Sequence, residues 1–408
     1  MSGDRDGARS GVLGKSAGLT ATQAGTWIFA LAWVSIVPRV LGPAAFGRFV
    51  FAFSVLSIAV VVGGFGLESF ILRAVARRDP ESHVAGALRF GAAGLGVVLA
   101  GAAIAIAGRA PLLTAGLAAG LFLQGTGNLL FAILQGHERP LPRGVVDVAS
   151  KGIFLAGSVL AARTSIGLGG IGVAYAAGYA AYAFGAVALV RARGWFPRGP
   201  VTTGTTRFLL RTAGPLGGHL IAQSIYYRTD SAMLEPIKGP ALTGVYGAAY
   251  RIFDTLSFVT TIYAAVISPR QMRLARHEPE AAARLLRRSL LAMAGLGAAG
   301  ALGIALLADP VISILFGPAY AGAIPLLRIL GIALGLSIAA TPLAWELLAR
   351  DAQGLLATIT GIAAVLNVAS NLYAIPRHGA TGAAVTTVLT EVVIVMLQAG
   401  AVRARRAG

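Results

Sequence analysis

The sequence predicts an all-α membrane protein with about twelve transmembrane helices. Apolar residues make up 56% of the 408 residues, and charged residues make up 12%. With the 54 glycines added, the apolar share reaches roughly 69%, against about 45–50% for soluble domains on the same count. Apolar runs of about 20 residues, the length that crosses a bilayer, recur along the whole chain. These observations exclude an ordinary soluble enzyme, a disordered chain and a coiled coil.

Each apolar run is expected to be a helix, because lipid cannot satisfy an open backbone. Residues 1–17 are expected to form a polar cytoplasmic tail, and the first run is interpreted as a retained span rather than a signal peptide. The expected spans cover residues 18–38, 46–70, 85–107, 110–135, 142–162, 168–191, 207–234, 243–268, 287–308, 322–348, 354–375 and 379–402.

Positive charge is concentrated in the short segments between these spans, and the formal net charge is +18. With the N-terminus inside, the inner segments hold 23 of the 34 cations and the outer segments hold 6. This bias predicts both termini in the cytoplasm and an even number of spans. Cations in such loops face anionic lipid, so we expect membrane lipid rather than nucleic acid as the partner.

An internal repeat divides the chain into halves. Residues 42–49 read GPAAFGRF and residues 239–246 read GPALTGVY, an offset of 197. Each copy follows the first span of its half. Six spans followed by six spans, both halves starting inside, predict a parallel repeat of two pseudo-symmetric six-helix lobes. The segment FGPAYAGA at 316–323 is interpreted as an insertion in the second half.

These boundaries predict five parts of the chain. The N-terminal tail (1–17) precedes an N-lobe of spans 1–6 at 18–191. A cytoplasmic linker at 192–206, rich in Gly, Pro and Thr, joins it to a C-lobe of spans 7–12 at 207–402. A basic tail follows at 403–408.

Sequence motifs for catalysis are sparse. The chain has no cysteine and 5 histidines. It contains none of the short motifs typical of zinc proteases, serine hydrolases or phosphate-binding loops. We therefore expect no enzyme, no catalytic residues, no metal and no cofactor.

The most informative residues are charges inside spans 7 and 8. Span 7 contains Arg228 and Asp230, and span 8 contains Arg251 and Asp254. Charges inside a membrane normally face a partner or water. Arg251 and Asp254 share one helix face, whereas Arg228 and Asp230 point in different directions, so at least one of these two should reach another helix or a lumen. Two interpretations stay open, an ion-pair network between the helices and the lining of a substrate cavity.

Other polar residues inside spans are weaker candidates. Gln124 and Asn128, one turn apart in span 4, fit either helix contacts or a cavity lining. Glu346 in span 10 and Glu391 in span 12 are isolated acids in the sequence, and such an acid is a candidate site for a coupling H⁺ or Na⁺.

Possible hinges lie where prolines and glycines interrupt spans. Pro215 and Gly217 fall within span 7, and Pro342 falls within span 10. Proline removes a helix hydrogen bond, so a helix can bend there. A gate and a static kink are both compatible with this pattern.

Several segments resemble the sequence of one transporter family. They are GPAAFGRF and GLESFILRAVARR in the first half and, in the second, YYRTDSAML, GPALTGVYGAAYRIFDTL, ISPRQMRL, LFGPAYAGAIPLLRIL and LNVASNLYAIPRHGATGAAVTTVLTEV. In this order they resemble the polysaccharide transporter family, the O-antigen and exopolysaccharide flippases of the multidrug/oligosaccharidyl-lipid/polysaccharide exporter superfamily, over about residues 15–400. The segment ILRAVAR departs from the family's expected Arg-Glu pair.

The resemblance implies two lobes around a central cavity and a flippase activity. It implies movement of a polyprenyl-diphosphate-linked oligosaccharide from the inner to the outer leaflet of the bacterial inner membrane by alternating access, for polysaccharide or O-antigen export. Arg228 and Arg251 would hold the diphosphate, since arginine presents a planar fork to phosphate oxygens. Other partners would be a coupling H⁺ or Na⁺ and polysaccharide assembly proteins. The alternatives are a cation-coupled multidrug exporter of the same superfamily and, ranked lower, a membrane-embedded glycan polymerase or ligase.

Overall fold

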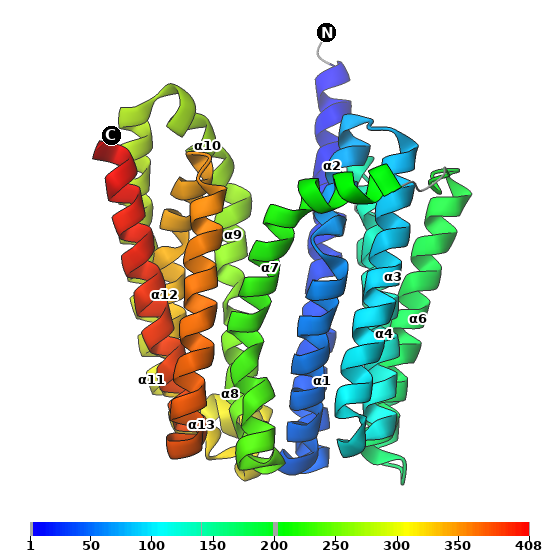
Figure 1. The fold of residues 1–408 in the computed structure, drawn as a ribbon, viewed down its shortest axis with the longest axis vertical. Helices are drawn as coiled ribbons and strands as arrows, with labels where there is room; N and C mark the ends of the chain where they lie inside the picture. Colours follow the sequence, from blue (N-terminus) through cyan, green and yellow to red (C-terminus); the bar gives the residue numbers. More distant parts are fainter. Residues whose placement is uncertain (1–2, 140, 199–202, 408) are drawn as a thin grey trace. The chain divides into compact units, whose positions relative to one another are not determined.

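The computed structural model describes residues 3–139, 141–198 and 203–407. These residues form α-helices with two short 3₁₀ turns and no β-strand (Figure 1). The first half contains α1 (Gly3–Gly64), α2 (Leu67–Arg77), α3 (Glu81–Ile106), α4 (Pro111–Gly136), α5 (Leu141–Ala162) and α6 (Gly167–Ala192). The second half contains α7 (Thr203–Lys238), α8 (Pro240–Leu256), α9 (Phe258–Val266), α10 (Ser268–His277), α11 (Pro279–Leu315), α12 (Ala323–Ala349) and α13 (Gln353–Ala407).

Every one of the twelve expected spans falls on these helices, which confirms the predicted fold class. The longest helices each join two expected spans: α1 has a non-helical glycine at Gly42 and α13 has one at Gly379. By length and composition, 8 helices of the described residues can cross a membrane, or 9 when α8 to α10, bent by 42°, count as one span. The 36-residue α7 is less apolar and is not among these candidates. The chain is a multi-pass membrane protein.

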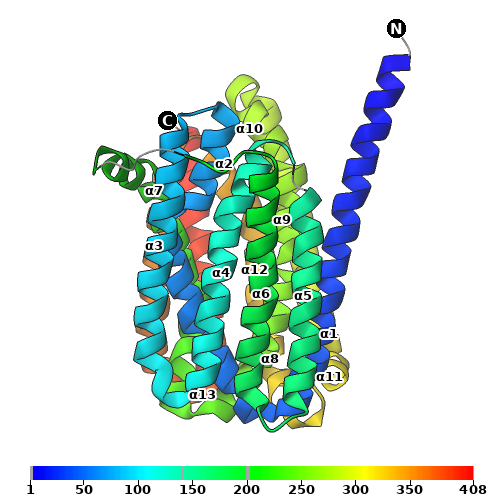
Figure 2. The same cartoon turned by 90° about the vertical axis from the view of Figure 1, so that its right-hand side faces the viewer.

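One compact unit comprises Met1–Leu41 and Val55–Gly217. Within it α4 packs against α2, α3 and α6, and α5 packs against α6. Figure 2 shows α3, α4, α6 and α5 side by side. Helices α4 and α6 approach closely because glycines face each other; a Cβ on Gly172 would lie 2.7 Å from the carbonyl oxygen of Leu113. Small residues allow this backbone approach in a membrane helix pair.

The other compact unit comprises Gly42–Ser54 and Gly218–Gly408. Its central helix is α12, which packs against α8, α9, α10, α11 and α13. Helix α4 is the fourth expected span and α12 is the tenth, so the two hold the same place in the two halves of the sequence. Each of them packs against several helices of its own unit. This correspondence fits the predicted repeat. The segment 42–54 groups with this unit, although it belongs to the first half of the sequence.

The expected tails and linker lie partly outside the described residues. Residues 1 and 2 of the expected N-terminal tail are outside them, and the rest of that tail is the start of α1. Residues 199–202 of the expected linker are also outside, and α7 begins at Thr203. Helix α13 extends through the expected basic tail to Ala407, with residue 408 outside.

The close contact of α11 with α12 predicts a sharp difference between two glycines of α11. A Cβ on Gly297 would overlap the carbonyl oxygen of Gly335, whereas Gly300 has open space around it. We expect Gly297→Val to lower the free energy of unfolding by about 1–3 kcal/mol, the usual cost of overpacking. The matched variant Gly300→Val should leave it nearly unchanged. Thermal unfolding in detergent measures both, and equal melting temperatures would contradict this packing.

Candidate functional site

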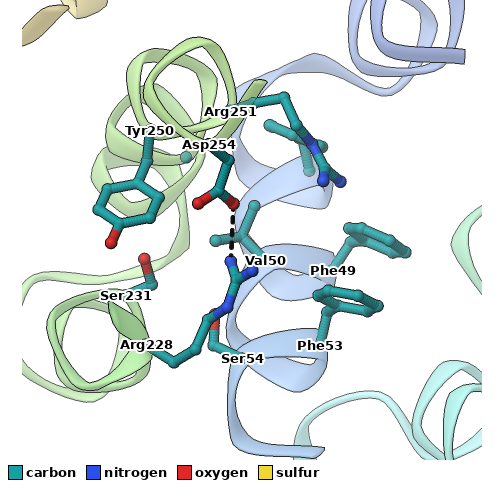
Figure 3. A pocket seen from close by; sticks show the side chains of 11 residues that line it. Phe49, Val50, Phe53, Ser54, Arg228, Ser231, Tyr250, Arg251 and Asp254 are labelled. Atoms are coloured by element: carbon teal, nitrogen blue, oxygen red, sulfur yellow. Dashed lines mark hydrogen bonds and ion pairs between the residues drawn. The ribbon is translucent and has the colours of Figure 1, made fainter. Parts of the chain in front are cut away.

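A partly open pocket lies within the unit that contains residues 42–54 and 218–408. The empty space in and at the mouth of this pocket is about 350 Å³, which includes open solvent. Its walls come from three helices (Figure 3). The lining residues are Phe46, Phe49, Val50, Phe53 and Ser54 of α1, Arg228 and Ser231 of α7, and Gly247, Tyr250, Arg251 and Asp254 of α8.

Helical periodicity places these side chains on single faces. On α8, the spacing of Gly247, Arg251 and Asp254 is four and then three residues, which aligns them on one side. On α1, Phe46, Phe49 and Phe53 repeat at the same spacing. Phe49 stacks on both neighbours, with ring centroids 6.2 Å from Phe46 and 5.7 Å from Phe53. The α1 side of the pocket is therefore an aromatic wall, which the sequence motif GPAAFGRF indicated only as part of a repeat.

The charged wall is formed by α7 and α8. The Arg228 Nη1 atom lies 3.0 Å from the Asp254 Oδ2 atom, and both side chains are about one-quarter exposed. Arg251 extends to the α1 side of the pocket, away from Asp254 (Figure 3). The lining residues thus include two cations and one acid, and the pocket carries a net positive charge. Three of the four charges expected in spans 7 and 8 line it.

Asp230 is not among the lining residues. It is 1% exposed and accepts hydrogen bonds from the Tyr246 hydroxyl and from the Ser231 backbone N–H, the latter at 2.6 Å. As the sequence predicts, Arg228 and Asp230 point to different partners. Asp230 joins α7 to α8 through hydrogen bonds to neutral groups, so these contacts form neither the expected ion pair nor a cavity lining.

Gln124 and Asn128 lie in the other unit, on α4. The hydroxyl groups of Tyr175 and Tyr182 donate to their amide oxygens, each at 2.9 Å. The guanidinium of Arg143 also donates to the Asn128 oxygen at 3.1 Å. These contacts connect α4 to α5 and α6.

An ion pair that the sequence reasoning missed belongs to the same network. The Arg143 Nη1 atom lies 3.1 Å from Glu68 Oε1, linking α5 to α2. Both residues lie near the ends of expected spans, Arg143 at the start of 142–162 and Glu68 near the end of 46–70. Their separation of 75 residues gives no local pattern that pairs them. By contrast, Asp147 and Lys151 are four residues apart on α5, so helix geometry alone brings them together, and they form an ion pair at 2.8 Å.

The two candidate coupling acids have different surroundings. Glu346 is fully buried and is not isolated, contrary to the sequence expectation. Arg350 Nε donates to it at 2.9 Å and Gln271 Nε2 at 3.0 Å. Arg350 lies beyond the expected end of the span at residue 348, but α12 runs to Ala349 and places Arg350 one turn from Glu346.

Glu391 is surrounded by hydroxyl groups. It is 2% exposed, and the Tyr226 hydroxyl donates to its Oε1 atom at 2.7 Å. The Ser337 hydroxyl is a second hydrogen-bond partner. Glu391 is thus a buried membrane acid that accepts hydrogen bonds from neutral hydroxyl groups, and a role as an ion site stays a prediction.

The expected hinges lie in helices that continue through them. Helix α7 runs through Pro215 and Gly217, and α12 runs through Pro342. A Cβ on Gly217 would lie 2.9 Å from the carbonyl oxygen of Phe65, where the chain turns between α1 and α2. The boundary between the two units falls directly after Gly217. The described residues contain no group of three or more His, Cys, Asp or Glu that would hold a metal.

Comparison with known proteins identifies a family and a fold. The family model described as "Polysaccharide biosynthesis protein" matches residues 12–275. An inward-facing multidrug resistance MATE family transporter of the MOP superfamily has a similar structure, with a TM-score of 0.72, 17% sequence identity, and coverage of 93% of this chain and 94% of that one. No curated protein sequence matches the chain.

Two further solved structures have the same fold. Lipid II flippase MurJ, in an inward closed conformation, gives a TM-score of 0.77 at 11% sequence identity. The match covers 94% of this chain and 87% of the MurJ chain. A MOP superfamily transporter from Pyrococcus furiosus, described as having a binding pocket of reverse polarity, gives a TM-score of 0.63 at 17% identity, with coverage of 95% and 94%. At these identities the likeness shows the fold alone.

The Arg228–Asp254 pair predicts an asymmetric response to mutation. Asp254→Ala leaves a partly buried guanidinium without its partner, so we expect a loss of about 2 kcal/mol in the free energy of unfolding. The double variant Arg228→Met with Asp254→Ala should recover most of this loss, because no unpaired charge remains. Denaturant unfolding in detergent measures both variants.

The exposed Arg284–Glu280 pair, 3.5 Å apart, provides the control. Glu280→Ala should change the free energy of unfolding by less than about 1 kcal/mol. A double variant no more stable than Asp254→Ala alone would contradict a direct pairing of Arg228 with Asp254.

Proposed function

We propose that this chain, which belongs to the polysaccharide biosynthesis protein family of the MOP superfamily, moves a polyprenyl-diphosphate-linked oligosaccharide across the bacterial plasma membrane. Its family and its fold support a membrane flippase or exporter. We further propose that transport runs from the inner to the outer leaflet and that both termini lie in the cytoplasm.

The observation that carries the proposal is the pair of arginines in the pocket. Arg228 and Arg251 line the same space, and Asp254 is the one acid among the lining residues. A diphosphate carries several negative charges that cannot cross bare hydrocarbon. Guanidinium groups stay charged at all physiological pH values and bind phosphate oxygens through paired N–H groups. The pocket therefore suits an anionic head group.

The aromatic part of the pocket lining suits the rest of such a substrate. Phe49 and Phe53 stack on each other on the side of α1 turned away from Arg228, and Arg251 extends toward that side (Figure 3). Ligand sites in proteins commonly combine apolar and aromatic walls with a few placed polar groups. A lipid diphosphate has this same combination, an anionic group next to an apolar chain, and the chain itself can remain in the bilayer.

Alternating access is the mechanism that we propose for this movement. The unit boundary after Gly217 lies next to Pro215, within α7, and Pro342 lies within α12. Proline weakens the local helix, so bending at these points requires less distortion. The pocket would then be exposed to each side of the membrane in turn.

A cation-coupled multidrug exporter is the second candidate function. The aromatic wall and the structural likeness to a multidrug resistance transporter favour it. The two arginines favour the flippase, because a cationic drug would meet a positively charged pocket.

The headgroup role predicts that both arginines are needed for transport. We expect Arg228→Ala and Arg251→Ala each to reduce flipping of a lipid-linked oligosaccharide in proteoliposomes about tenfold or more, since loss of a buried charge partner typically costs this much or more in binding. Arg251→Lys should recover only part of the activity, because lysine keeps the charge without the fork.

The control is Arg328→Ala in α12. Its Nε atom donates to the Ala305 carbonyl at 3.2 Å at an exposed position, so we expect wild-type flipping. Full activity of folded Arg228→Ala and Arg251→Ala proteins would rule out the headgroup role.

We propose Glu391 rather than Glu346 as the coupling site, because Glu346 already has a cation partner. Glu391→Gln should make the flipping rate independent of an imposed H⁺ or Na⁺ gradient. Glu346→Gln should retain that dependence. Flipping rates with and without each gradient measure both variants, and an unaltered gradient response in Glu391→Gln would reject the assignment.

A further inference from the structure

The pocket lining contains two cations and one acid, and the acid is paired with one of the cations. The Asp254 Oδ2 atom lies 3.0 Å from the Arg228 Nη1 atom. Arg251 extends away from this pair to the α1 side (Figure 3). With Asp254 ionised, the lining residues carry one net positive charge, and without this acid they would carry two.

The Arg228–Asp254 pair can be reached by a ligand. Both residues line the pocket, and their side chains are 27% and 24% exposed. Two other acids of the same unit, Glu346 and Asp230, are at most 1% exposed, and neither lines the pocket. Asp254 is therefore placed to exchange its partner for a ligand, whereas Glu346 and Asp230 are placed to keep the partners that they have.

Asp254 has one role when the pocket is empty. A charged side chain inside a membrane is costly unless it meets a partner or water. Leaving one member of a buried ion pair without its partner is strongly destabilising. When an anionic ligand leaves Arg228, the carboxylate of Asp254 can take its place. The charge of Arg228 is then balanced in the empty protein as well as in the loaded one.

Asp254 has a second role when an anion is bound. A phosphate group that takes the N–H groups of Arg228 has to displace the carboxylate, which then lies close to a ligand of its own sign. Repulsion between like charges is stronger in a partly buried site than in water. This repulsion lowers the affinity for the anion and raises the rate at which it leaves. Transport needs binding that is weak enough for the ligand to leave again.

We infer that Asp254 is an exchangeable counter-ion, a carboxylate that pairs with Arg228 in the empty pocket, gives way to the diphosphate, and returns when the diphosphate leaves. The inference rests on the proposed function, because it takes the diphosphate as the anion that enters. It assigns Arg228 and Arg251 to the capture of the substrate and Asp254 to its release.

The first test measures binding. Asp254→Asn keeps the shape of the side chain and an oxygen acceptor for Arg228, but it removes the negative charge. The probe is a diphosphate with one methyl group on each phosphorus, titrated into purified protein in a neutral detergent. We expect its Kd to fall about tenfold or more, because a close pair of charges contributes at least that factor to binding. Asp254→Glu keeps the charge and should keep the wild-type Kd. An unchanged Kd in folded Asp254→Asn would overturn the counter-ion.

The matched control is Glu68→Gln in the other unit. Glu68 pairs with Arg143 at 3.1 Å, much as Asp254 pairs with Arg228. Neither Glu68 nor Arg143 lines the pocket, so the Kd of the probe should equal that of the wild type. An equal fall of the Kd in Glu68→Gln and Asp254→Asn would show a general gain in anion binding and would overturn the role of Asp254.

The second test does not depend on the folding of Asp254→Asn alone. It compares Arg228→Gln with the double variant Arg228→Gln, Asp254→Asn, which carries no unpaired charge from this pair. The double variant should bind the probe about tenfold or more tightly than Arg228→Gln, because the acid that repels the probe is gone. Equal Kd values for these two proteins would contradict a repulsion between Asp254 and the bound anion.

The third test separates release from capture. With protein in excess over the lipid-linked oligosaccharide, Asp254→Asn should complete its first flipping event at the wild-type rate. In steady state it should flip about tenfold or more slowly, because tighter binding slows release. A purely structural defect would slow the first event and the steady state alike. A first event slowed as much as the steady state, or a steady-state rate equal to the wild type, would reject the release role.

The results also distinguish the counter-ion from the proposed substrate. A wild-type protein that flips the lipid-linked oligosaccharide, together with an Asp254→Asn protein of unchanged Kd and turnover, would overturn the counter-ion and leave the function standing. A wild-type protein that fails to flip this lipid, while Asp254→Asn still binds the diphosphate probe more tightly, would overturn the substrate and support an exchangeable counter-ion for another anion.

Discussion

The cost of placing charge in a membrane determines how the second half of this chain is built. Arg228 can lie inside span 7 because Asp254 of the next helix meets it at 3.0 Å, and Asp230 can lie two residues further because it is held by Tyr246. Each contact crosses from α7 to α8, so these two helices are linked by groups that would be costly to leave unpaired. The pocket exists on the remaining open side of this linked pair, with Arg251 directed to the other wall.

Hydropathy and loop charge were sufficient to locate the spans, because a membrane helix needs a long apolar run and little else. The repeat was predicted instead from the matching segments GPAAFGRF and GPALTGVY, and it stays a prediction. The contact of Lys151 with Asp147 is one that local spacing can predict, because the two residues lie one turn apart on one helix. The pairing of Arg143 with Glu68 and of Gln271 with Glu346 was beyond sequence reasoning, since it depends on which helices are neighbours. Glu346 was expected to be isolated because its partner Arg350 lies outside the expected span 322–348.

At the candidate site too, helix periodicity predicts which residues of one helix share a face, but it does not predict which helices are neighbours. The shared face of Arg251 and Asp254 follows from helix geometry, and both residues do line the pocket. The aromatic wall of Phe46, Phe49 and Phe53 follows from the same geometry once the segment is known to be helical. That these rings and the charged residues line one pocket required the fold, because residues 42–54 and 228–254 are far apart in the sequence.

The connection between α7 and α8 has a mechanical consequence. Only Gly239 separates Lys238, the end of one helix, from Pro240, the start of the next. A linker of one residue has no slack, so it cannot absorb sliding or spreading of the helices that it joins. Helices α7 and α8 from Gly218 to Leu256 are therefore expected to travel as a single rod-like hairpin, carrying the Arg228–Asp254 pair intact through every stage of the transport cycle.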